Sequence, residues 1–276
     1  MLIDSHHHFW QYDPEEYPWI NDQMSVLKQN FEPDTLQSLI EKAGVDQVVS
    51  VQARQTIEET DWLLKLAEEN AFIPGVVGWL PLTSDEIQSL VERYSHSPKL
   101  KAVRHVVQDE DAETFLEQKK FNQGIEWLTE FRIVYDLLIF GHQLPATITF
   151  VDKHPEQFFV LDHIAKPSID SREFDKAWEF NFRELAKREN VVCKFSGVVT
   201  EVRDPDWDLT TIQPYWEVAL EAFGPSRLMV GTDWPVCLLK TDYVTWIQTV
   251  TMLASGLSVD EREQFFYKTA QEAYQL

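Results

Sequence analysis

Two histidines separated by one residue follow the first apolar run of the chain. Alternate side chains of an extended segment lie on one face, so His6 and His8 are predicted to point one way and His7 the other. A pair of this kind at the end of a strand brings two imidazoles to one point, which is typical of a metal or substrate site. The pattern therefore predicts such a site at His6 and His8.

An aspartate follows the last short apolar run, which ends at Val230. Gly231 and Thr232 precede Asp233, and a tryptophan and a proline follow it. This arrangement predicts a buried strand that turns sharply into a loop, with one carboxylate at its C-terminal tip. A carboxylate held there can take a proton from water, and we interpret Asp233 as the general base of a hydrolase.

Polar side chains also follow the other apolar runs. They are Gln52, Arg54, Trp79, Arg104, His105, Asp136, His142, His163 and Lys166. Each is weak evidence by itself: His105 is equally well explained as a hydrogen-bonded structural histidine, and Lys166 as a solvated surface group. Arg54 and Arg104 would also suit ion pairs with the many carboxylates, and Asp162 could orient His163. Their convergence on one ring would be the stronger signal.

Near-continuous apolar runs alternate with segments of helical periodicity. The runs are 1–4, 47–51, 72–78, 100–103, 131–135, 157–161, 191–195 and 227–230. Helices are expected at 32–43, 59–70, 83–94, 113–130, 172–189 and 212–223, followed by two more, with capping boxes at Thr83–Glu86 and Ser258–Glu261. Strands that are apolar on both faces and separated by helices indicate a parallel sheet with helices outside. A count of eight strands favours a (β/α)8 TIM barrel, an α/β fold, over an open doubly wound sheet.

No glycine-rich phosphate loop follows any of these runs, which weakens the case for a dinucleotide-binding fold. No linker or composition break divides the chain, so we expect one domain over residues 1–276. In barrel enzymes the active face is the end where the strands finish, and the polar residues cluster there.

The formal charge is −22, from 46 acidic and 24 basic residues. Such a field repels phosphate backbones and anionic lipid, so we expect no nucleic-acid partner and no membrane binding. No apolar stretch approaches the ~20 residues that span a bilayer, and the N-terminal segment has no export signal pattern. We expect a cytoplasmic protein that acts on a small molecule. The oligomeric state stays open, a homo-oligomer included.

In combination, these segments resemble the amidohydrolase superfamily. The motifs are Asp4-Ser5-His6-x-His8-Phe9-Trp10, Val51-Gln52-Ala53-Arg54, Gly78-Trp79, Val103-Arg104-His105, Asp162-His163-x-x-Lys166-Pro167, Ser196-Gly197 and Gly231-Thr232-Asp233-Trp234-Pro235. They are most similar to the amidohydrolase 2 branch of sugar-lactone hydrolases, such as the L-fuconolactone and L-rhamnonolactone hydrolases. The similarity runs nearly from end to end.

The resemblance implies that Asp233 activates a water molecule and that His6, His8 and His163 lie at a lactone carbonyl or at a metal. It implies substrate contacts from Gln52, Arg54, Trp79, Arg104, His105, Asp136, His142 and Lys166. Superfamily members with two metals use a lysine on strand four and a histidine on strand five, whereas this chain has Arg104-His105 and Asp136 there. This difference argues against a two-metal centre. One divalent ion (Zn or Mn) on His6, His8 and Asp233, with or without His163, stays open, as does no metal at all.

The leading hypothesis is a carboxylic-ester hydrolase, a lactonase, that opens an L-fucono-, L-rhamnono- or L-galactonolactone type of ring. One alternative is a metal-dependent decarboxylase of the same branch, which would release CO₂ and stop on chelation. Another is a non-catalytic sugar-acid-binding protein, which would bind lactones without turnover.

Overall fold

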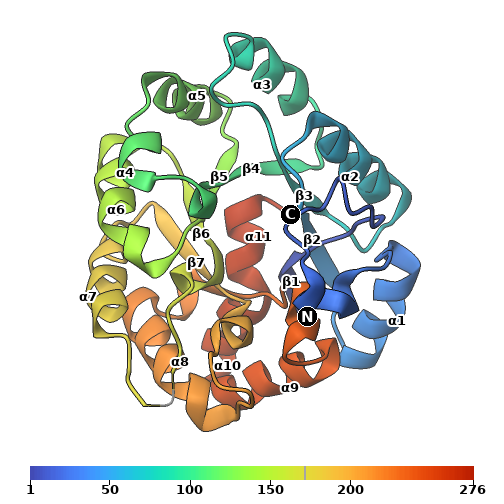
Figure 1. The fold of residues 1–276 in the computed structure, drawn as a ribbon, viewed down its shortest axis with the longest axis vertical. Helices are drawn as coiled ribbons and strands as arrows, with labels where there is room; N and C mark the ends of the chain where they lie inside the picture. The colour runs from blue at the N-terminus through green and yellow to red at the C-terminus, as the bar shows by residue number, and fades with distance from the viewer. Residues whose placement is uncertain (171) are drawn as a thin grey trace.

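The structure is a computed structural model that describes residues 1–170 and 172–276. Within these ranges, eight parallel strands follow one another around a single sheet in the order β1 to β8 (Figure 1). They are β1 (Ile3–His7), β2 (Gln47–Val51), β3 (Gly75–Gly78), β4 (Leu100–Val106), β5 (Val134–Leu138), β6 (Phe159–Leu161), β7 (Val191–Phe195) and β8 (Leu228–Val230).

The chain that follows β8 closes the sheet by returning to β1. The His8 N–H donates to Trp234 O at 2.7 Å, and the Asp233 N–H donates to His6 O at 2.7 Å. A parallel ring with helices outside is the (β/α)8 barrel, so the expected fold is confirmed.

Helices surround this ring, and the last of them closes one end of it. They are α1 (Pro33–Ala43), α2 (Ile57–Glu69), α3 (Ile87–Ser95), α4 (Ala112–Phe115), α5 (Lys119–Glu130), α6 (Leu144–Lys153), α7 (Lys176–Leu185), α8 (Leu209–Phe223), α9 (Tyr243–Leu253), α10 (Val259–Glu263) and α11 (Thr269–Tyr274). α1 illustrates the local rules: it buries Leu36 and Ile40 on one stripe and ends at Gly44, which has the left-handed φ of 71° common after a helix.

Three helix predictions are wrong. The helix expected at 113–130 is divided into α4 and α5, and the Asn122 side-chain amide donates to the carbonyls of Leu116 and Gln118 where the two helices meet. α6 was not expected, because its threonine, isoleucine and valine residues favour strands; burial of its apolar side decides the outcome. α3 begins at Ile87, since Ser84 and not Thr83 accepts the Glu86 N–H. The capping box at Ser258–Glu261 is confirmed.

Side chains that face into the barrel form two layers. The lower layer is apolar, and α11, red in the middle of Figure 1, packs against it; its strand residues are Ile3, Val49, Val51, Val77, Ala102, Val134, Val160, Val192 and Met229. Above it lie Arg104, Asp136, Asp162 and Lys194, each at most 3% exposed. We call these four residues the charged layer.

Asp136 belongs to this layer, so its expected place on the rim is wrong. It follows Val134 by two residues on β5, and the alternation of the strand therefore points it into the barrel. Its carboxylate accepts hydrogen bonds from Lys194 and Tyr274, and it is fully buried. A substrate at the mouth would not reach it.

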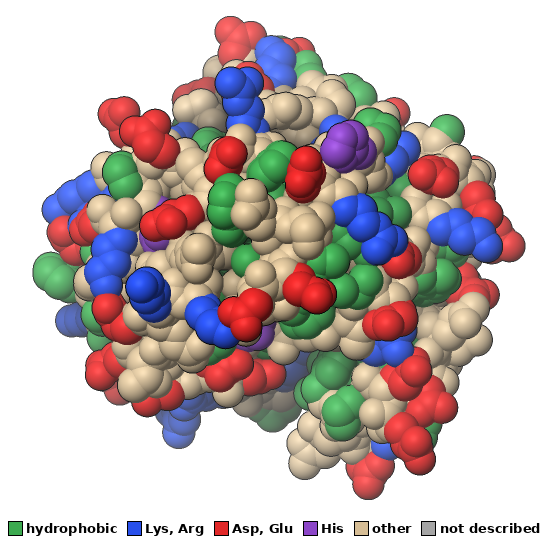
Figure 2. Space-filling model, turned by 90° about the horizontal axis from the view of Figure 1, so that it is seen from above, with side chains coloured by type: hydrophobic (Ala, Val, Ile, Leu, Met, Phe, Trp, Pro, Cys, Tyr) green, Lys and Arg blue, Asp and Glu red, His purple; other side chains and the backbone are tan. Residues whose placement is uncertain are grey.

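Acidic and basic side chains are interspersed on the face shown in Figure 2. Among the residues that the structure describes, no helix combines the length and the apolarity needed to cross a bilayer.

Candidate active site

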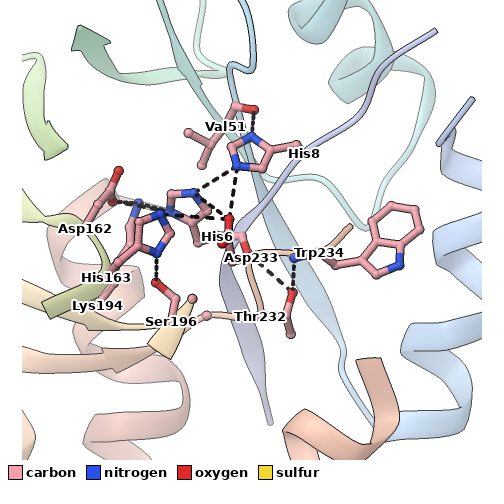
Figure 3. Close-up of polar contacts among 12 residues, drawn as sticks. His6, His8, Val51, Asp162, His163, Lys194, Ser196, Thr232, Asp233 and Trp234 are labelled. Carbon is pink, nitrogen blue, oxygen red and sulfur yellow. Dashed lines mark hydrogen bonds and ion pairs between the residues drawn. The ribbon is translucent and has the colours of Figure 1, made fainter. Parts of the chain in front are cut away.

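His6, His8 and Asp233 meet at the C-terminal end of the barrel (Figure 3). His6 Nε2 lies 3.2 Å from His8 Nε2 and 3.7 Å from Asp233 Oδ1, and His8 Nε2 lies 3.3 Å from the same oxygen. All three side chains are buried. His7 points away, with Nε2 2.9 Å from Ser50 Oγ, so the predicted alternation of the three histidines is confirmed.

His163 approaches the same carboxylate from β6. Its Nε2 is 3.9 Å from Asp233 Oδ1, and its Nδ1 is 2.9 Å from Ser196 Oγ. Residues 163 to 166 all have positive φ, which makes a left-handed turn directly after the strand. Gly197, with φ of 61°, leaves the necessary room: a Cβ there would lie 2.7 Å from His163 Nδ1 and 2.9 Å from Asp233 Oδ2. The structure therefore brings the four predicted catalytic residues together.

Burial and charge set the protonation of this group. Burial lowers the pKa of His163 to about 4 and the pKa of His6 well below its usual value, so both rings are neutral near pH 7. Burial alone would raise the pKa of Asp233, but the nearby His163, His8 and Lys166 hold it below its usual value. Asp233 is therefore ionised and able to accept a proton.

The donor atoms fit one divalent ion. His8 Nδ1 donates to Val51 O at 2.8 Å, which leaves a lone pair on Nε2. His6 Nδ1 lies 3.3 Å from Asp162 Oδ1, which favours the same arrangement in that ring. Two imidazole nitrogens and Asp233 Oδ1 thus lie 3.2–3.7 Å apart with lone pairs facing one another. A tetrahedral zinc ion with bonds of about 2.0–2.1 Å spaces its ligands by about 3.4 Å.

A second candidate set, His6, Asp162 and His163, shares His6 with the first. In the part of the chain that the structure describes, the two sets therefore do not offer independent ligands for two ions.

The charged layer lies directly beneath His6. Lys194 Nζ is 2.7 Å from Asp136 Oδ2, 2.9 Å from Asp162 Oδ1 and 3.2 Å from His6 Nδ1. Arg104 Nη1 donates to Asp162 Oδ2 at 2.9 Å. Asp162 thus contacts His6 rather than orienting the histidine that follows it, which corrects that interpretation. Sequence reasoning missed Lys194, although a lysine inside an apolar run is a signal that could have identified it.

Gln52 and Arg104 hold each other near the mouth. Arg104 Nη2 donates to Gln52 O at 2.5 Å, and Gln52 Nε2 donates to Arg104 O at 3.3 Å. Gln52 Oε1 and Arg104 Nε are buried without a hydrogen-bond partner among the described residues. These two atoms are consequently candidates for contact with a ligand.

Three other predicted contacts are already paired with neighbouring groups. Arg54 Nε donates to Glu59 Oε2 at 2.8 Å. Trp79 Nε1 lies 3.4 Å from His105 Nδ1, and His105 Nε2 lies 3.2 Å from Glu110 Oε1. If Arg54, Trp79 and His105 bind a substrate, their side chains are already held in position by these contacts.

A cavity of about 660 Å³ opens among the loops that follow β5, β6 and β7. His142 and Lys166 line it as neighbours, together with Phe140. Glu201 and Arg203, which sequence reasoning missed, also line it, and Glu201 Oε1 is 4.0 Å from Lys166 Nζ. The cavity thus offers both hydrogen-bond donors and an acceptor.

A (β/α)8 barrel with one histidine on β1, a second directly after that strand, a third after β6 and an aspartate after β8 defines a hydrolase scaffold of the amidohydrolase type. A family model described as amidohydrolase matches residues 3–276, and the chain belongs to this family. The expected resemblance is confirmed.

The chain is 40% identical to an L-fucono-1,5-lactonase from Burkholderia multivorans, with 100% of this chain and 96% of the relative covered. It is also similar to two crystal structures of an amidohydrolase from Burkholderia multivorans. The structure with bound HEPES has 39% identity and a TM-score of 0.96, and covers 100% of this chain and 99% of that one. The structure with bound zinc has 40% identity and a TM-score of 0.94 at the same coverage.

Proposed function

We propose that the protein hydrolyses the ester ring of a sugar-acid lactone, of the L-fucono-1,5-lactone type. The observation that carries the proposal is the ionised Asp233 among His6, His8 and His163. Similarity to an L-fucono-1,5-lactonase along the whole chain supports the substrate class. The cavity among the loops after β5, β6 and β7 includes Lys166, three residues after His163, and its mixed polar and apolar lining would suit a hydroxylated ring.

In this mechanism, the Asp233 carboxylate accepts a proton from water while the water oxygen bonds to the lactone carbonyl carbon. The carbonyl π electrons move onto oxygen, and His163, held by Ser196, stabilises the charge that develops there. As those electrons return, the ring C–O bond breaks. The ring oxygen takes the proton from Asp233, and an open-chain hydroxy acid results.

A bound ion would be held by His6 Nε2, His8 Nε2 and Asp233 Oδ1. We propose zinc, since two imidazoles and a carboxylate suit it and a similar crystal structure contains it. Its chemistry in such a site is to polarise the carbonyl and to lower the pKa of bound water. The contacts from His6, His8 and His163 reach Oδ1 of Asp233, so we assign the proton to Oδ2.

Substrate contacts are proposed on both sides of this centre. Lys166, His142 and Arg203 would donate to hydroxyls in the cavity, and Glu201 would accept from one. The full proposed set is Gln52, Arg54, Trp79, Arg104, His105, His142, Lys166, Glu201 and Arg203.

A pH-indicator screen of L- and D-aldonolactones tests the proposal. We expect ring opening of L-sugar lactones far above the spontaneous rate, loss of activity after chelation, and recovery with zinc. Full activity after chelation would show that the reaction needs no metal, and the mechanism with Asp233 as the base would still stand. Lactone binding without turnover, or CO₂ release from unsaturated acids, would contradict lactone hydrolysis.

A further inference from the structure

The charged layer contains one ammonium group that the mechanism does not use. Lys194 comes from the interior of β7, is fully buried and does not line the cavity. We propose that Lys194 is a positioning residue: by holding Asp162, it fixes the His6 ring with a proton on Nδ1 and a lone pair on Nε2. The inference rests on the proposed role of His6 in lactone hydrolysis.

Asp162 is held by cations on both of its oxygens. Lys194 Nζ lies 2.9 Å from Oδ1, and Arg104 Nη1 donates to Oδ2 at 2.9 Å. The two cations come from β7 and β4, on different sides of the carboxylate, so its plane is fixed. Lys194 also pairs with Asp136 at 2.7 Å, which balances two buried carboxylates with two buried cations. Buried charges are tolerated when they are paired in this way.

The fixed carboxylate acts on His6. Asp162 Oδ1 lies 3.3 Å from His6 Nδ1, so its negative charge favours a proton on that nitrogen. A carboxylate in this outer position selects the tautomer and orientation of a histidine that binds a metal or a substrate. Lys194 Nζ lies 3.2 Å from the same nitrogen, and donation from it would select the opposite tautomer. Arg104 distinguishes the two tautomers. Its Nη1 lies 3.4 Å from His6 Nε2, and a guanidinium can only donate, so His6 Nε2 must carry the lone pair and Nδ1 the proton.

Lys194→Met is the test variant, and Tyr274→Phe is its matched control. Tyr274 OH donates to Asp136 Oδ2 at 2.7 Å from α11, so it contacts the charged layer through Asp136. Each variant removes one polar partner of Asp136, so both should lower the unfolding temperature. Only Lys194→Met should change His6.

Two measurements separate positioning from stability. Competition with a chromophoric chelator should show zinc affinity at least tenfold lower in Lys194→Met, since outer partners of metal ligands contribute about 10–100-fold. Turnover of a lactone should fall by about 10²-fold with KM little changed, as expected for a displaced catalytic group. Tyr274→Phe should stay close to the unsubstituted protein in both. Normal zinc affinity and kcat in a folded Lys194→Met protein would overturn the proposal.

Nitrogen-15 chemical shifts of the His6 ring, recorded on the protein as purified, report the tautomer without any substrate. We expect a proton on Nδ1 in the unsubstituted protein and in Tyr274→Phe. We expect a mixture in Lys194→Met, because Asp162 loses the cation on Oδ1 and its carboxylate can turn away from His6 Nδ1. An unchanged ring in Lys194→Met would also overturn the proposal. If Lys194→Met does not fold, Lys194→Met/Asp136→Asn removes both members of one ion pair and takes its place. A tautomer change in a protein that opens no lactone would overturn the proposed function and leave the role of Lys194 standing.

Discussion

The Thr232 hydroxyl donates a 2.7 Å hydrogen bond to the Asp4 carboxylate and so joins the chain after β8 to β1. Asp4 also accepts the Thr232 N–H at 2.9 Å and the Tyr243 hydroxyl at 3.0 Å. Asp4 is fully buried, and burial raises its pKa to about 6 despite these bonds. Asp4 lies two residues before His6, and Thr232 lies one residue before Asp233. The hydrogen bond between Asp4 and Thr232 therefore helps to fix the distance between His6 and Asp233.

Thr232→Val should destabilise the protein, because it deprives the Asp4 carboxylate and the Trp234 N–H of a buried partner while keeping the side-chain volume. We expect a loss of about 1–3 kcal/mol in the free energy of unfolding, measured with urea. Thr249→Val is the control, since that hydroxyl donates only to Thr245 O within its own helix. Equal losses in the two variants would show that the contact with Asp4 adds no stability.

Asp233→Asn should abolish most of the lactonase activity while the protein still folds. The amide cannot accept the proton of water, and a positioned general base contributes about 10²–10⁴-fold to turnover. Steady-state kinetics on the best lactone measure the effect. Asp242→Asn makes the same chemical change at the cap of α9, where its side chain accepts the Thr245 N–H, and should leave turnover unchanged. Activity of Asp233→Asn near that of this control would remove Asp233 from the mechanism.

Gly197→Ala should impair both stability and turnover. The new Cβ would lie 2.7 Å from His163 Nδ1 and 2.9 Å from Asp233 Oδ2, at a left-handed φ of 61°. We expect kcat to fall at least about tenfold, since a small displacement of a catalytic group is costly. Gly44→Ala has a similar φ of 71° with open space around it, so it carries the backbone strain alone. Unfolding temperature should fall in both variants and kcat only in Gly197→Ala; a normal kcat there would show that the site accommodates a methyl group.

His154 should make stability depend on pH. Burial lowers the pKa of His154 in the folded protein. Below about pH 6.5 this histidine therefore binds a proton more readily in the unfolded chain than in the folded protein. The stability linked to this group is full above pH 6.5 and decreases as the pH falls, by less than the ~1.4 kcal/mol per pH unit that one proton allows. His154→Gln should flatten the slope of unfolding free energy between pH 6.5 and 5. A slope in His154→Gln as steep as in the unsubstituted protein would contradict the prediction.

Much of the fold follows from local sequence. Strands such as 47–51 and 191–195 are continuous apolar runs between helices, and this pattern specifies a parallel sheet without any tertiary information. The grouping of His6, His8, His163 and Asp233 follows too, because all of them end strands that finish at one mouth.

The depth of a residue along its strand does not follow from sequence. Asp136 and His105 both stand at the ends of predicted strands. Asp136 in fact lies in the middle of β5 and faces the interior, whereas His105 is partly exposed. Asp162 and His163 are sequence neighbours, but the left-handed turn at His163 sends them to different partners. Glu201 could not be identified because it reaches the cavity through a short helical turn, residues 198–201, that carries no chemical motif.

The packing of α11 against the lower opening of the barrel determines how molecules travel to and from the active centre. Ala270, Ala273 and Tyr274 fill that opening, and the apolar and charged layers above it are buried. A sugar cannot pass through this end, so the lactone substrate and the acid product must enter and leave by the same opening, at the C-terminal end of the strands. If the reaction is lactone hydrolysis, a bound acid product prevents the next lactone from binding. Product that accumulates is therefore expected to act as a competitive inhibitor.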